Sequence, residues 1–339
     1  MRGVPGGRRA AIALAPAVLL LAGCGNNQNA LAPKSHQARD IASLFWWMMV
    51  GAWIGLAVVV ALLLLSWKRA RRRADSDTSA KPGERTGWYV VVGAGIVAPI
   101  VLLVTLFAIS DLFVIRTTQA PAASSTRLTV LVVGHQWWWE VRYPGRGVVT
   151  ANEIHIPVRT PVRVDVRTDD VIHSFWVPQL NRKIDTLPGK TNAIELYADA
   201  VGRYRGQCAE FCGLQHAHMG LYVFAEPRAR FDTWLAGQAK PAAEPRDALA
   251  RAGRDAFLNG TCSTCHAIRG TSASGDTGPD LTHLASRTTI AALTLPNTES
   301  GLREWVGDPQ RYKPGNEMPG LHLSSSRLDE LVAYLRGLR

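Results

Sequence analysis

The sequence predicts a multidomain membrane protein in which a two-helix transmembrane hairpin precedes an all-β domain and then an all-α domain. Two uncharged apolar runs, at 44–67 and 88–110, are each long enough to cross a bilayer, which takes about 20 residues. Short β-branched segments separated by Pro and Gly then continue to about residue 225. Helical patterns around a C-x-x-C-H motif fill the rest of the chain.

The N-terminus has the pattern of a bacterial lipoprotein signal. An arginine-bearing head and a short apolar stretch lead to the sequence Leu-Ala-Gly-Cys, and polar GNNQN follows Cys24 at once. We therefore predict a signal peptide over 1–23 and lipidation of Cys24. A plain signal peptide with a chance cysteine is the alternative. The segment 24–116 then contains the new N-terminus and both spans.

The basic surplus of the chain indicates membrane topology rather than nucleic-acid binding. The formal net charge is +11, and the stretches 2–9 and 68–87 together hold +7 of it. The second stretch joins the two spans and carries seven Lys/Arg against three acidic residues, an excess typical of cytoplasmic loops. We therefore expect the N-terminus and everything after about residue 112 on the outer face of the bacterial cell membrane, and no nucleic-acid partner.

The two spans themselves carry no residue for chemistry. Neither 44–67 nor 88–110 contains a His, Asp, Glu, Lys or Arg. Such residues supply the haem pockets and proton relays of membrane proteins. The chain alone should therefore build neither of these within the bilayer.

The exported part divides into two predicted domains. Over 127–238 the segments RLTVLVV, NEIHIPV, PVRVDVRT, NAIELYA and LYVFA predict a β-sandwich or barrel, closed by a short helix in RARFDTWLAGQA. KPAAEPR marks a linker at 239–247, flexible enough for more than one placement of the last domain. That domain, 248–339, ends in the amphipathic segment SSRLDELVAYLRGL.

The C-x-x-C-H motif of the last domain predicts a covalently attached c-type haem. Its thiols, Cys262 and Cys265, would add to the haem vinyl groups, and His266 would ligate the iron. Met318 lies 52 residues further on between turn-forming residues, where a distal thioether ligand is expected. The motif alone would also allow a zinc or redox pair of cysteines.

Two further histidines, His283 and His322, leave one alternative for the haem. We expect both at the surface, and ligation of the iron by two histidines is the alternative to the methionine.

The stretch CAEFCGLQHAHMG, at 208–220, gathers several metal-binding residue types. Cys208 and Cys212 could form a disulfide, and zinc would accept Cys and His, but neither explains Met219. Thiolate, imidazole and a weak thioether together are copper ligands. With His216 from this stretch and His173 from DVIHSFWVP, two bridging thiolates and one imidazole on each metal would hold two copper ions.

This interpretation uses all five cysteines and both methionines of the exported part. Structural disulfides would leave one thiol over and would explain neither methionine. The sequence therefore predicts two metal centres.

Three motifs resemble those of subunit II of haem–copper oxidases. They are HSFWVP, CAEFCGLQHAHM and GHQWWWEVRYP, and the order of signal, spans, β domain and cytochrome matches the cytochrome-c-fused form along nearly the whole chain. The resemblance implies a cupredoxin-like Greek-key barrel with a dinuclear copper (CuA) centre. It also implies that the all-α domain is a class I cytochrome c.

The resemblance also implies individual roles. The copper ligands would be two imidazoles, two bridging thiolates and a weak thioether, from His173, His216, Cys208, Cys212 and Met219. Glu210 would give its backbone carbonyl to the second copper, and its side chain would reach a magnesium shared with a partner subunit. A solvated loop carboxylate is the alternative for that side chain. His218 matches no ligand position. Trp137 would be the gateway for electrons from cytochrome c, with barrel packing as its structural alternative.

The implied function is electron transfer within a terminal cytochrome c oxidase, a proton-translocating enzyme. Electrons would pass from the c-type haem to the dinuclear copper and on to a catalytic subunit I, among further membrane subunits, where oxygen would be reduced to water. Cytochrome c or a quinol–cytochrome c reductase would be the donor. The alternatives are the CuA subunit of a nitric oxide reductase and an exported copper carrier or assembly factor, to which a covalent haem would be superfluous.

Overall fold

The computed structural model describes residues 28–74, 84–122, 125–126 and 128–339. The chain forms two compact units, Gln37–Gln119 on the one hand and Met1–His36 with Ala120–Arg339 on the other. The signal peptide predicted over 1–23 and the lipidation predicted at Cys24 lie outside the described residues, and both stay predictions.

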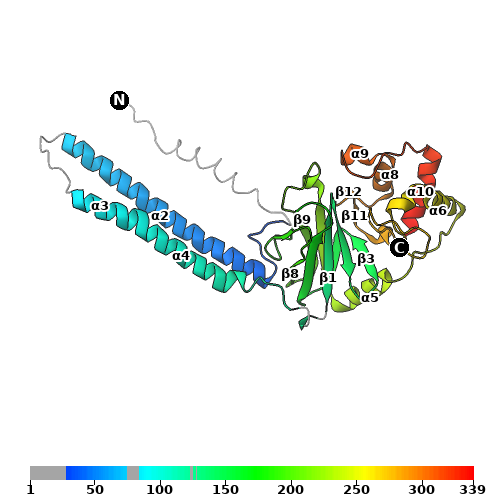
Figure 1. Cartoon of the computed structure of the whole chain (residues 1–339), viewed down its shortest axis with the longest axis horizontal. Helices are drawn as coiled ribbons and strands as arrows, with labels where there is room; N and C mark the ends of the chain where they lie inside the picture. Colours follow the sequence, from blue (N-terminus) through cyan, green and yellow to red (C-terminus); the bar gives the residue numbers. More distant parts are fainter. Residues whose placement is uncertain (1–27, 75–83, 123–124, 127) are drawn as a thin grey trace, which may run out of the picture. The chain divides into compact units, whose positions relative to one another are not determined.

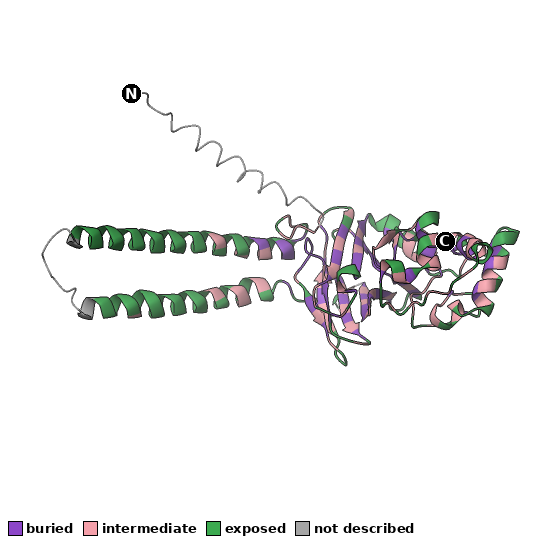
Figure 2. Cartoon of the chain, turned by 90° about the horizontal axis from the view of Figure 1, so that it is seen from above, coloured by how far each residue is buried: buried purple, intermediate pink, exposed green. Residues whose placement is uncertain are grey.

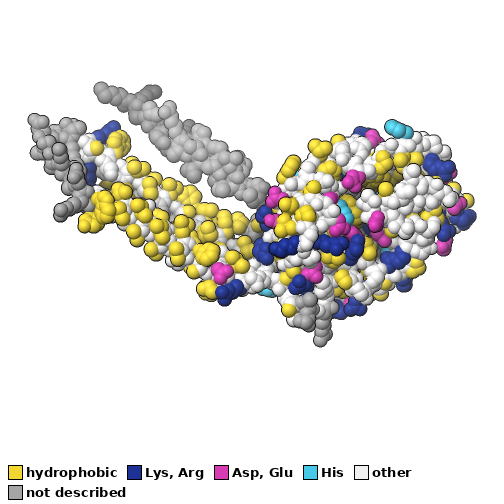
Figure 3. All heavy atoms as spheres, in the orientation of Figure 1, with side chains coloured by type: hydrophobic (Ala, Val, Ile, Leu, Met, Phe, Trp, Pro, Cys, Tyr) yellow, Lys and Arg dark blue, Asp and Glu magenta, His cyan; other side chains and the backbone are white. Residues whose placement is uncertain are grey.

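The unit Gln37–Gln119 is helical, and most of its described side chains are exposed (Figure 2). Its elements are α2 (His36–Ala74), α3 (Glu84–Val92), η1 (Gly93–Val97), α4 (Ala98–Ser110) and η2 (Asp111–Ile115). Two stretches, His36–Arg72 and Gly87–Ile115, are long and apolar enough to cross a membrane. Apolar side chains cover the visible face of both (Figure 3). Exposed helices that are apolar all round are typical of membrane spans, so this unit fits a membrane protein.

In the other unit, the described residues between 128 and 226 form two five-stranded sheets (Figure 1). The strand orders are β3-β2-β1-β5-β8 and β4-β10-β9-β6-β7. The bounds are β1 (Thr129–His135), β2 (Trp138–Tyr143), β3 (Val148–Ala151), β4 (Glu153–Pro157), β5 (Val162–Thr168), β6 (His173–Trp176), β7 (Ile184–Thr186), β8 (Asn192–Leu196), β9 (Gly202–Cys208) and β10 (Gly220–Glu226). β1 runs parallel to β5 and β4 to β10, whereas the other neighbouring strands are antiparallel.

Residue alternation builds the core between the two sheets. In β5, Val162, Val164 and Val166 are fully buried, and the charged residues between them point the other way. The helix α5 (Arg228–Gln238) closes one end of the domain by burying Phe231, and burial of a side chain of this size contributes about 1.5–3 kcal/mol. The result is a cupredoxin-like β-sandwich.

The C-terminal domain is helical. Its elements are α6 (Ala248–Asn259), α7 (Cys262–Cys265), η5 (Leu284–Ser286), β11 (Thr289–Ile290), β12 (Leu295–Pro296), α8 (Glu299–Gly307), α9 (Pro309–Tyr312) and α10 (Ser325–Gly337). α6 begins where the Asp247 carboxylate accepts a hydrogen bond from the Ala250 amide at 2.8 Å. α6 and α10 pack closely because Gly253 has no side chain: a Cβ there would lie 1.9 Å from the Glu330 carbonyl oxygen.

The segment that joins the two domains is held along the C-terminal domain. The Ala242 amide donates to the Arg269 carbonyl at 2.9 Å, and the Arg269 guanidinium donates to the Gln238 carbonyl at 3.0 Å. Nε2 of His283 lies 2.9 Å from the Lys240 carbonyl oxygen. The expectation that His283 is a surface residue is wrong, because the joining segment covers it and leaves its side chain 5% exposed.

Candidate metal centres

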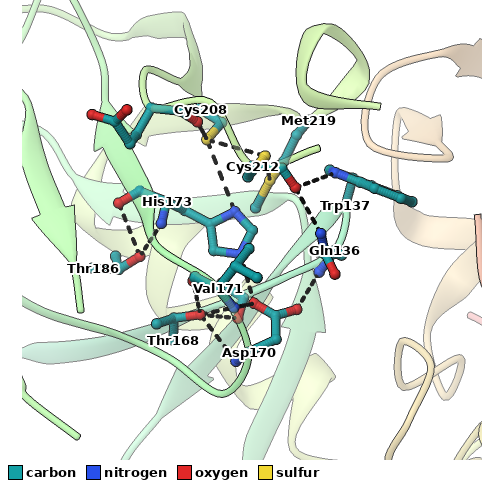
Figure 4. Close-up of polar contacts among 12 residues, drawn as sticks. Gln136, Trp137, Thr168, Asp170, Val171, His173, Thr186, Cys208, Cys212 and Met219 are labelled. Atoms are coloured by element: carbon teal, nitrogen blue, oxygen red, sulfur yellow. Dashed lines mark hydrogen bonds and ion pairs between the residues drawn. The ribbon is translucent and has the colours of Figure 1, made fainter. Parts of the chain in front are cut away.

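Strand pairing brings His173 and Cys208 together although 35 positions separate them in sequence. β6 begins at His173 and runs antiparallel to β9, which ends at Cys208, so that Phe175 lies opposite Cys208. The chain then loops out and returns at Met219, whose carbonyl accepts a hydrogen bond from the Cys208 amide at 2.9 Å. This hydrogen bond closes the loop at its base and brings both its ends to one site (Figure 4).

Side chains of this loop, together with His173 of β6, face one another around two sulfur atoms. Sγ of Cys208 lies 3.8 Å from Sγ of Cys212 and 3.9 Å from Nδ1 of His173. Sγ of Cys212 lies 3.6 Å from Nδ1 of His216 and 3.8 Å from Sδ of Met219. Each sulfur therefore has its own imidazole, and the thioether lies on the Cys212 side.

The chemistry of these donors fits a pair of soft cations. Both cysteines are free, and Cys208, Cys212, His173 and Met219 are all at most 4% exposed. The hydrogen bond from Cys212 lowers the pKa of Cys208, whereas the neighbouring thiolate and burial raise the pKa of Cys212. Two thiolates this close repel each other, so both ionise only with cations between them. Thiolate, imidazole and thioether donors are those that copper selects.

Asp170 fixes the orientation of His173, and sequence reasoning missed it. Its carboxylate lies 2.7 Å from Nε2 of His173, which directs Nδ1 toward Cys208 (Figure 4). The same carboxylate accepts hydrogen bonds from the Gln136 amide at 2.6 Å and from the Thr168 hydroxyl at 2.9 Å. Acceptors of this kind set the tautomer of ligating histidines. The only signal in the sequence was an aspartate three residues before the histidine.

Trp137 contacts the loop 208–219, which we call the copper loop, through its ring. Its Nε1 donates to the Cys212 carbonyl at 2.9 Å, and the Gln136 side chain donates to the same oxygen at 2.7 Å. Trp139 is fully buried with its ring 5.9 Å from that of His173, centroid to centroid. Trp138 instead stacks on His135 at 4.5 Å. Trp137 and Trp139 therefore contact the site, whereas Trp138 lies on the other side of the strand.

Glu210 and His218 lie at the edge of the site. The Glu210 carbonyl oxygen is 3.2 Å from Sγ of Cys208, and its half-exposed carboxylate is 4.0 Å from Nζ of Lys183. His218, in the short helix η4 (His216–His218), directs Nδ1 to the Gln215 side chain at 2.7 Å. The Glu210 carbonyl thus lies against Sγ of Cys208, whereas Nδ1 of His218 is engaged by Gln215.

In the C-terminal domain the residues of the C-x-x-C-H motif line a cavity of about 320 Å³. Cys262, Cys265, His266 and Met318 all contribute to its wall, together with apolar side chains such as Trp305. Neither of the other histidines of this domain is among the described residues that line the cavity. Among these described residues, Met318 therefore shares the cavity wall with His266.

The cavity fits a group ligated by His266. Nδ1 of His266 lies 2.8 Å from the Pro279 carbonyl, in the segment TGPDL, so this nitrogen carries the proton and Nε2 has a free lone pair. Gly278 makes room for the ring, since a Cβ there would lie 2.5 Å from Cε1 of His266. Asn316 accepts the Met318 amide at 2.9 Å and thereby shapes the loop that carries the methionine.

In comparisons with known proteins, the β domain and the C-terminal helical domain match two different family models. The model of the cytochrome c oxidase subunit II periplasmic domain matches residues 145–225, and the cytochrome c model matches residues 250–339. Cytochrome c oxidase subunit 2 of Alkalihalophilus pseudofirmus is 35% identical over 332 residues, which cover 95% of this chain and 94% of the relative. The chain belongs to the cytochrome c oxidase subunit 2 family.

One further relative and one solved domain are also similar to parts or all of the chain. Cytochrome c oxidase subunit 2 of Bacillus sp. (strain PS3) is 30% identical over 339 residues, covering 95% of this chain and 94% of the relative. The solved periplasmic domain of subunit II of the Bradyrhizobium japonicum cytochrome oxidase is 32% identical; the match covers 34% of this chain and 94% of that chain, with a TM-score of 0.33.

Family membership makes the chain a subunit of a haem–copper oxidase with a fused cytochrome c domain. A periplasmic domain of subunit II implies copper, and a cytochrome c domain implies haem. The residues described above fit both groups. We call residues 128–238 the copper domain and residues 248–339 the haem domain.

Proposed function

We propose that this chain is the electron-transfer subunit of a terminal cytochrome c oxidase and that Trp137 connects its two redox sites. One observation carries the proposal: Trp137 lines the cavity of the haem domain, and its ring also donates to the Cys212 carbonyl at 2.9 Å. When bound, a c-type haem and a dinuclear copper each supply a centre that takes up and releases one electron. The protein supplies short, buried contacts between them.

Individual residues would hold the two groups. In the copper domain the ligands would be the two Nδ1 atoms, the two thiolates, the thioether and one backbone carbonyl, from His173, His216, Cys208, Cys212, Met219 and Glu210. In the haem domain Cys262 and Cys265 would form the thioether bonds, and His266 and Met318 would ligate the iron. The Glu210 carboxylate would remain available to a magnesium shared with the partner subunit.

The copper site is suited to electron transfer rather than to bond chemistry. Four of its side-chain donors are buried; the Asp170 carboxylate restrains the His173 ring by accepting its hydrogen bond, and Gln136 restrains the backbone by donating to the Cys212 carbonyl. Small ligand movements on reduction favour fast transfer at a small driving force. The spans at 44–67 and 88–110 lack His, Asp, Glu, Lys and Arg, so oxygen reduction and proton translocation would occur in a partner catalytic subunit.

The proposed topology follows from the charges around the spans. The basic segment 68–87 would be cytoplasmic, which places the N-terminus and both exported domains on the outer face of the bacterial membrane. A cytochrome c or a quinol–cytochrome c reductase would deliver electrons to the haem domain. Catalytic subunit I and further membrane subunits would surround the spans.

Metal analysis with electron paramagnetic resonance of the full chain tests this function. We expect two tightly bound coppers per haem and a signal from one unpaired electron shared by both coppers. Cys212→Ser should abolish that signal and leave the c-type haem spectrum intact, whereas His218→Gln should keep both. One labile copper or none per haem would support a copper carrier instead. Loss of the haem together with the copper would argue against separate centres.

A further inference from the structure

Lys313 is a buried cation at the border of the copper and haem domains. Its side chain is 4% exposed, and burial lowers its pKa to about 7. No carboxylate among the described residues lies within ion-pairing distance of it. Its ammonium instead donates to the carbonyl of Trp137 at 2.7 Å. A buried charge with no carboxylate beside it is costly, even though negative charge at Cys212 acts to raise the pKa of Lys313, so a contact that retains this charge points to a role beyond packing.

The chain around Lys313 contacts the copper loop as well. The Pro314 carbonyl accepts a hydrogen bond from the Gln215 side chain at 2.7 Å. At Gly315, whose φ is +79°, a Cβ would lie 2.8 Å from Cδ1 of Leu214. Lys313, Pro314 and Gly315 of the haem domain thus all lie against the copper domain.

The same segment leads directly to the haem cavity. The Lys313 amide donates to the Pro309 carbonyl at 3.0 Å, which ties the segment to α9. The Asn316 side chain then shapes the turn before Met318, and both Lys313 and Met318 line the cavity. The segment that carries Lys313 therefore borders the haem cavity as well as the copper domain.

Trp137 accepts a hydrogen bond from the haem domain and donates one within the copper domain. Its backbone carbonyl accepts from Lys313 of the haem domain, and its ring Nε1 donates to the Cys212 carbonyl in the copper loop. The Lys313 ammonium thus fixes the peptide from which the connecting ring projects.

We propose that Lys313 is a positioning residue for electron transfer between the two sites, because it fixes the Trp137 peptide against the haem domain. This inference rests on the proposed function. With both groups bound, the step would move one electron from a reduced haem, which would be oxidised, to an oxidised copper pair, which would be reduced; no bond would break and no proton would move. Tunnelling rates fall steeply with distance, so a loosened Trp137 slows this step while both metal sites remain intact.

The test uses the full chain with Lys313→Met and a matched control, Lys240→Met, which removes an exposed lysine from the joining segment. Haem absorbance and copper resonance first establish that both centres are present. Pulse reduction of the haem then gives the rate of haem-to-copper transfer, and redox titration gives both potentials. Hydrogen–deuterium exchange of residues 136–139, in the metal-free chain too, reports how firmly the Trp137 peptide is held.

We expect Lys313→Met to speed exchange at 136–139 and to slow transfer by about tenfold, a loss typical of removing an outer-shell support, with both potentials unchanged. Lys240→Met should change none of these values. Faster exchange with an unchanged transfer rate overturns the proposal. Unchanged exchange also overturns it, whatever the rate, since Lys313 would then not hold this peptide. A slower rate explained by shifted potentials overturns it as well.

If Lys313→Met loses a centre, Lys313→Leu takes its place, since it also removes the donor to the Trp137 carbonyl and keeps an apolar side chain of similar bulk. The same outcomes then apply: exchange and transfer must change together at constant potentials. Absence of copper or haem from the parent chain would instead refute the proposed function, which separates the two failures.

Discussion

The copper and haem domains prepare their metal sites in different ways. In the copper domain the donor atoms of His173, Cys208 and Cys212 all lie within 4.8 Å of one another, and the surrounding strands leave little space between them. In the haem domain Cys262 and Met318 lie on the wall of a cavity of about 320 Å³. One site is assembled by the protein's own hydrogen bonds, whereas the other depends on a group that fills it.

This difference follows from the elements that carry the ligands. His173 and Cys208 are on paired strands of a ten-stranded sandwich in the described part of the chain, and pairing fixes their separation. Cys262 and Cys265 belong to a four-residue helix, and Met318 lies in a loop. The comparison teaches that loss of the bound group should unfold the haem domain but not the copper domain.

Preventing haem attachment should give the largest effect. Without the haem, the apolar wall of a cavity of about 320 Å³ would be left open to water, and this loss of burial would remove much of the stability of the haem domain. We expect Cys262→Ser combined with Cys265→Ser to remove the calorimetric unfolding transition of the haem domain. The copper resonance should persist. A haem-domain transition at its original temperature would show that the two domains do not differ in this way.

Gly253→Ala should destabilise the haem domain by roughly 3 kcal/mol, because the added Cβ would overlap the Glu330 carbonyl at 1.9 Å. The matched control is Gly237→Ala in α5, where a Cβ meets nothing within 4 Å and should stabilise the helix by about 0.5–1 kcal/mol. Denaturant unfolding followed by haem absorbance measures the first change, and tryptophan fluorescence the second. Equal small effects would mean that α6 and α10 are not in close contact.

Asp170→Asn tests whether the protein's own hydrogen bonds hold the copper ligands in place. Loss of the carboxylate that orients His173 should weaken copper binding by about 10–100-fold, or about 1.4–2.8 kcal/mol. Asp169→Asn is the control, since its carboxylate is half-exposed and pairs with Arg167. Competition with a copper chelator gives the affinities. If the two variants bind copper equally well, the ring of His173 does not need its acceptor.

The smallest expected effect is a pH dependence inside the copper domain, away from the metal ligands. Nδ1 of His155 lies 3.0 Å from the Glu226 carboxylate. Burial alone would lower the pKa of His155, but the bonds to Glu153 and Glu226 raise it above its ordinary value of 6.5. The stabilisation is therefore complete below pH 6.5 and is lost as the pH rises through the raised pKa.

Thermal unfolding of the copper domain between pH 6 and pH 9 checks this sign. His155→Gln should remove the decline at the alkaline end, and exposed His322→Gln should keep it. A parent domain whose stability rises with pH over this range would contradict the assignment.

The features that the sequence could predict are those that depend on residues close to one another along the chain. Cys262, Cys265 and His266 form one contiguous motif, and the alternation of Val162, Val164 and Val166 already indicates a strand with one buried face. The apolar runs likewise predict helices long enough to cross a membrane, which the structure confirms. In each case the physical cause acts within a few residues.

The features that sequence could not predict depend on contacts between distant residues. Lys313 and Trp137 are 176 positions apart, and no local pattern links them. Sequence reasoning expected a flexible linker, yet its residues bond to Arg269 and cover His283. Asp170 lies close to His173 in sequence, but only the path of the loop shows that its carboxylate reaches Nε2.

The central claim is that the two sites communicate through the ring that touches both, and the rate of haem-to-copper transfer in the full chain tests it most directly. Trp137→Phe removes the hydrogen bond to the Cys212 carbonyl, whereas Trp138→Phe alters a ring that also lines the haem cavity but stacks on His135. With both centres present and their potentials unchanged, Trp137→Phe should slow transfer by about tenfold and Trp138→Phe should leave it near the parent rate. Equal rates in the parent and both variants would contradict the account.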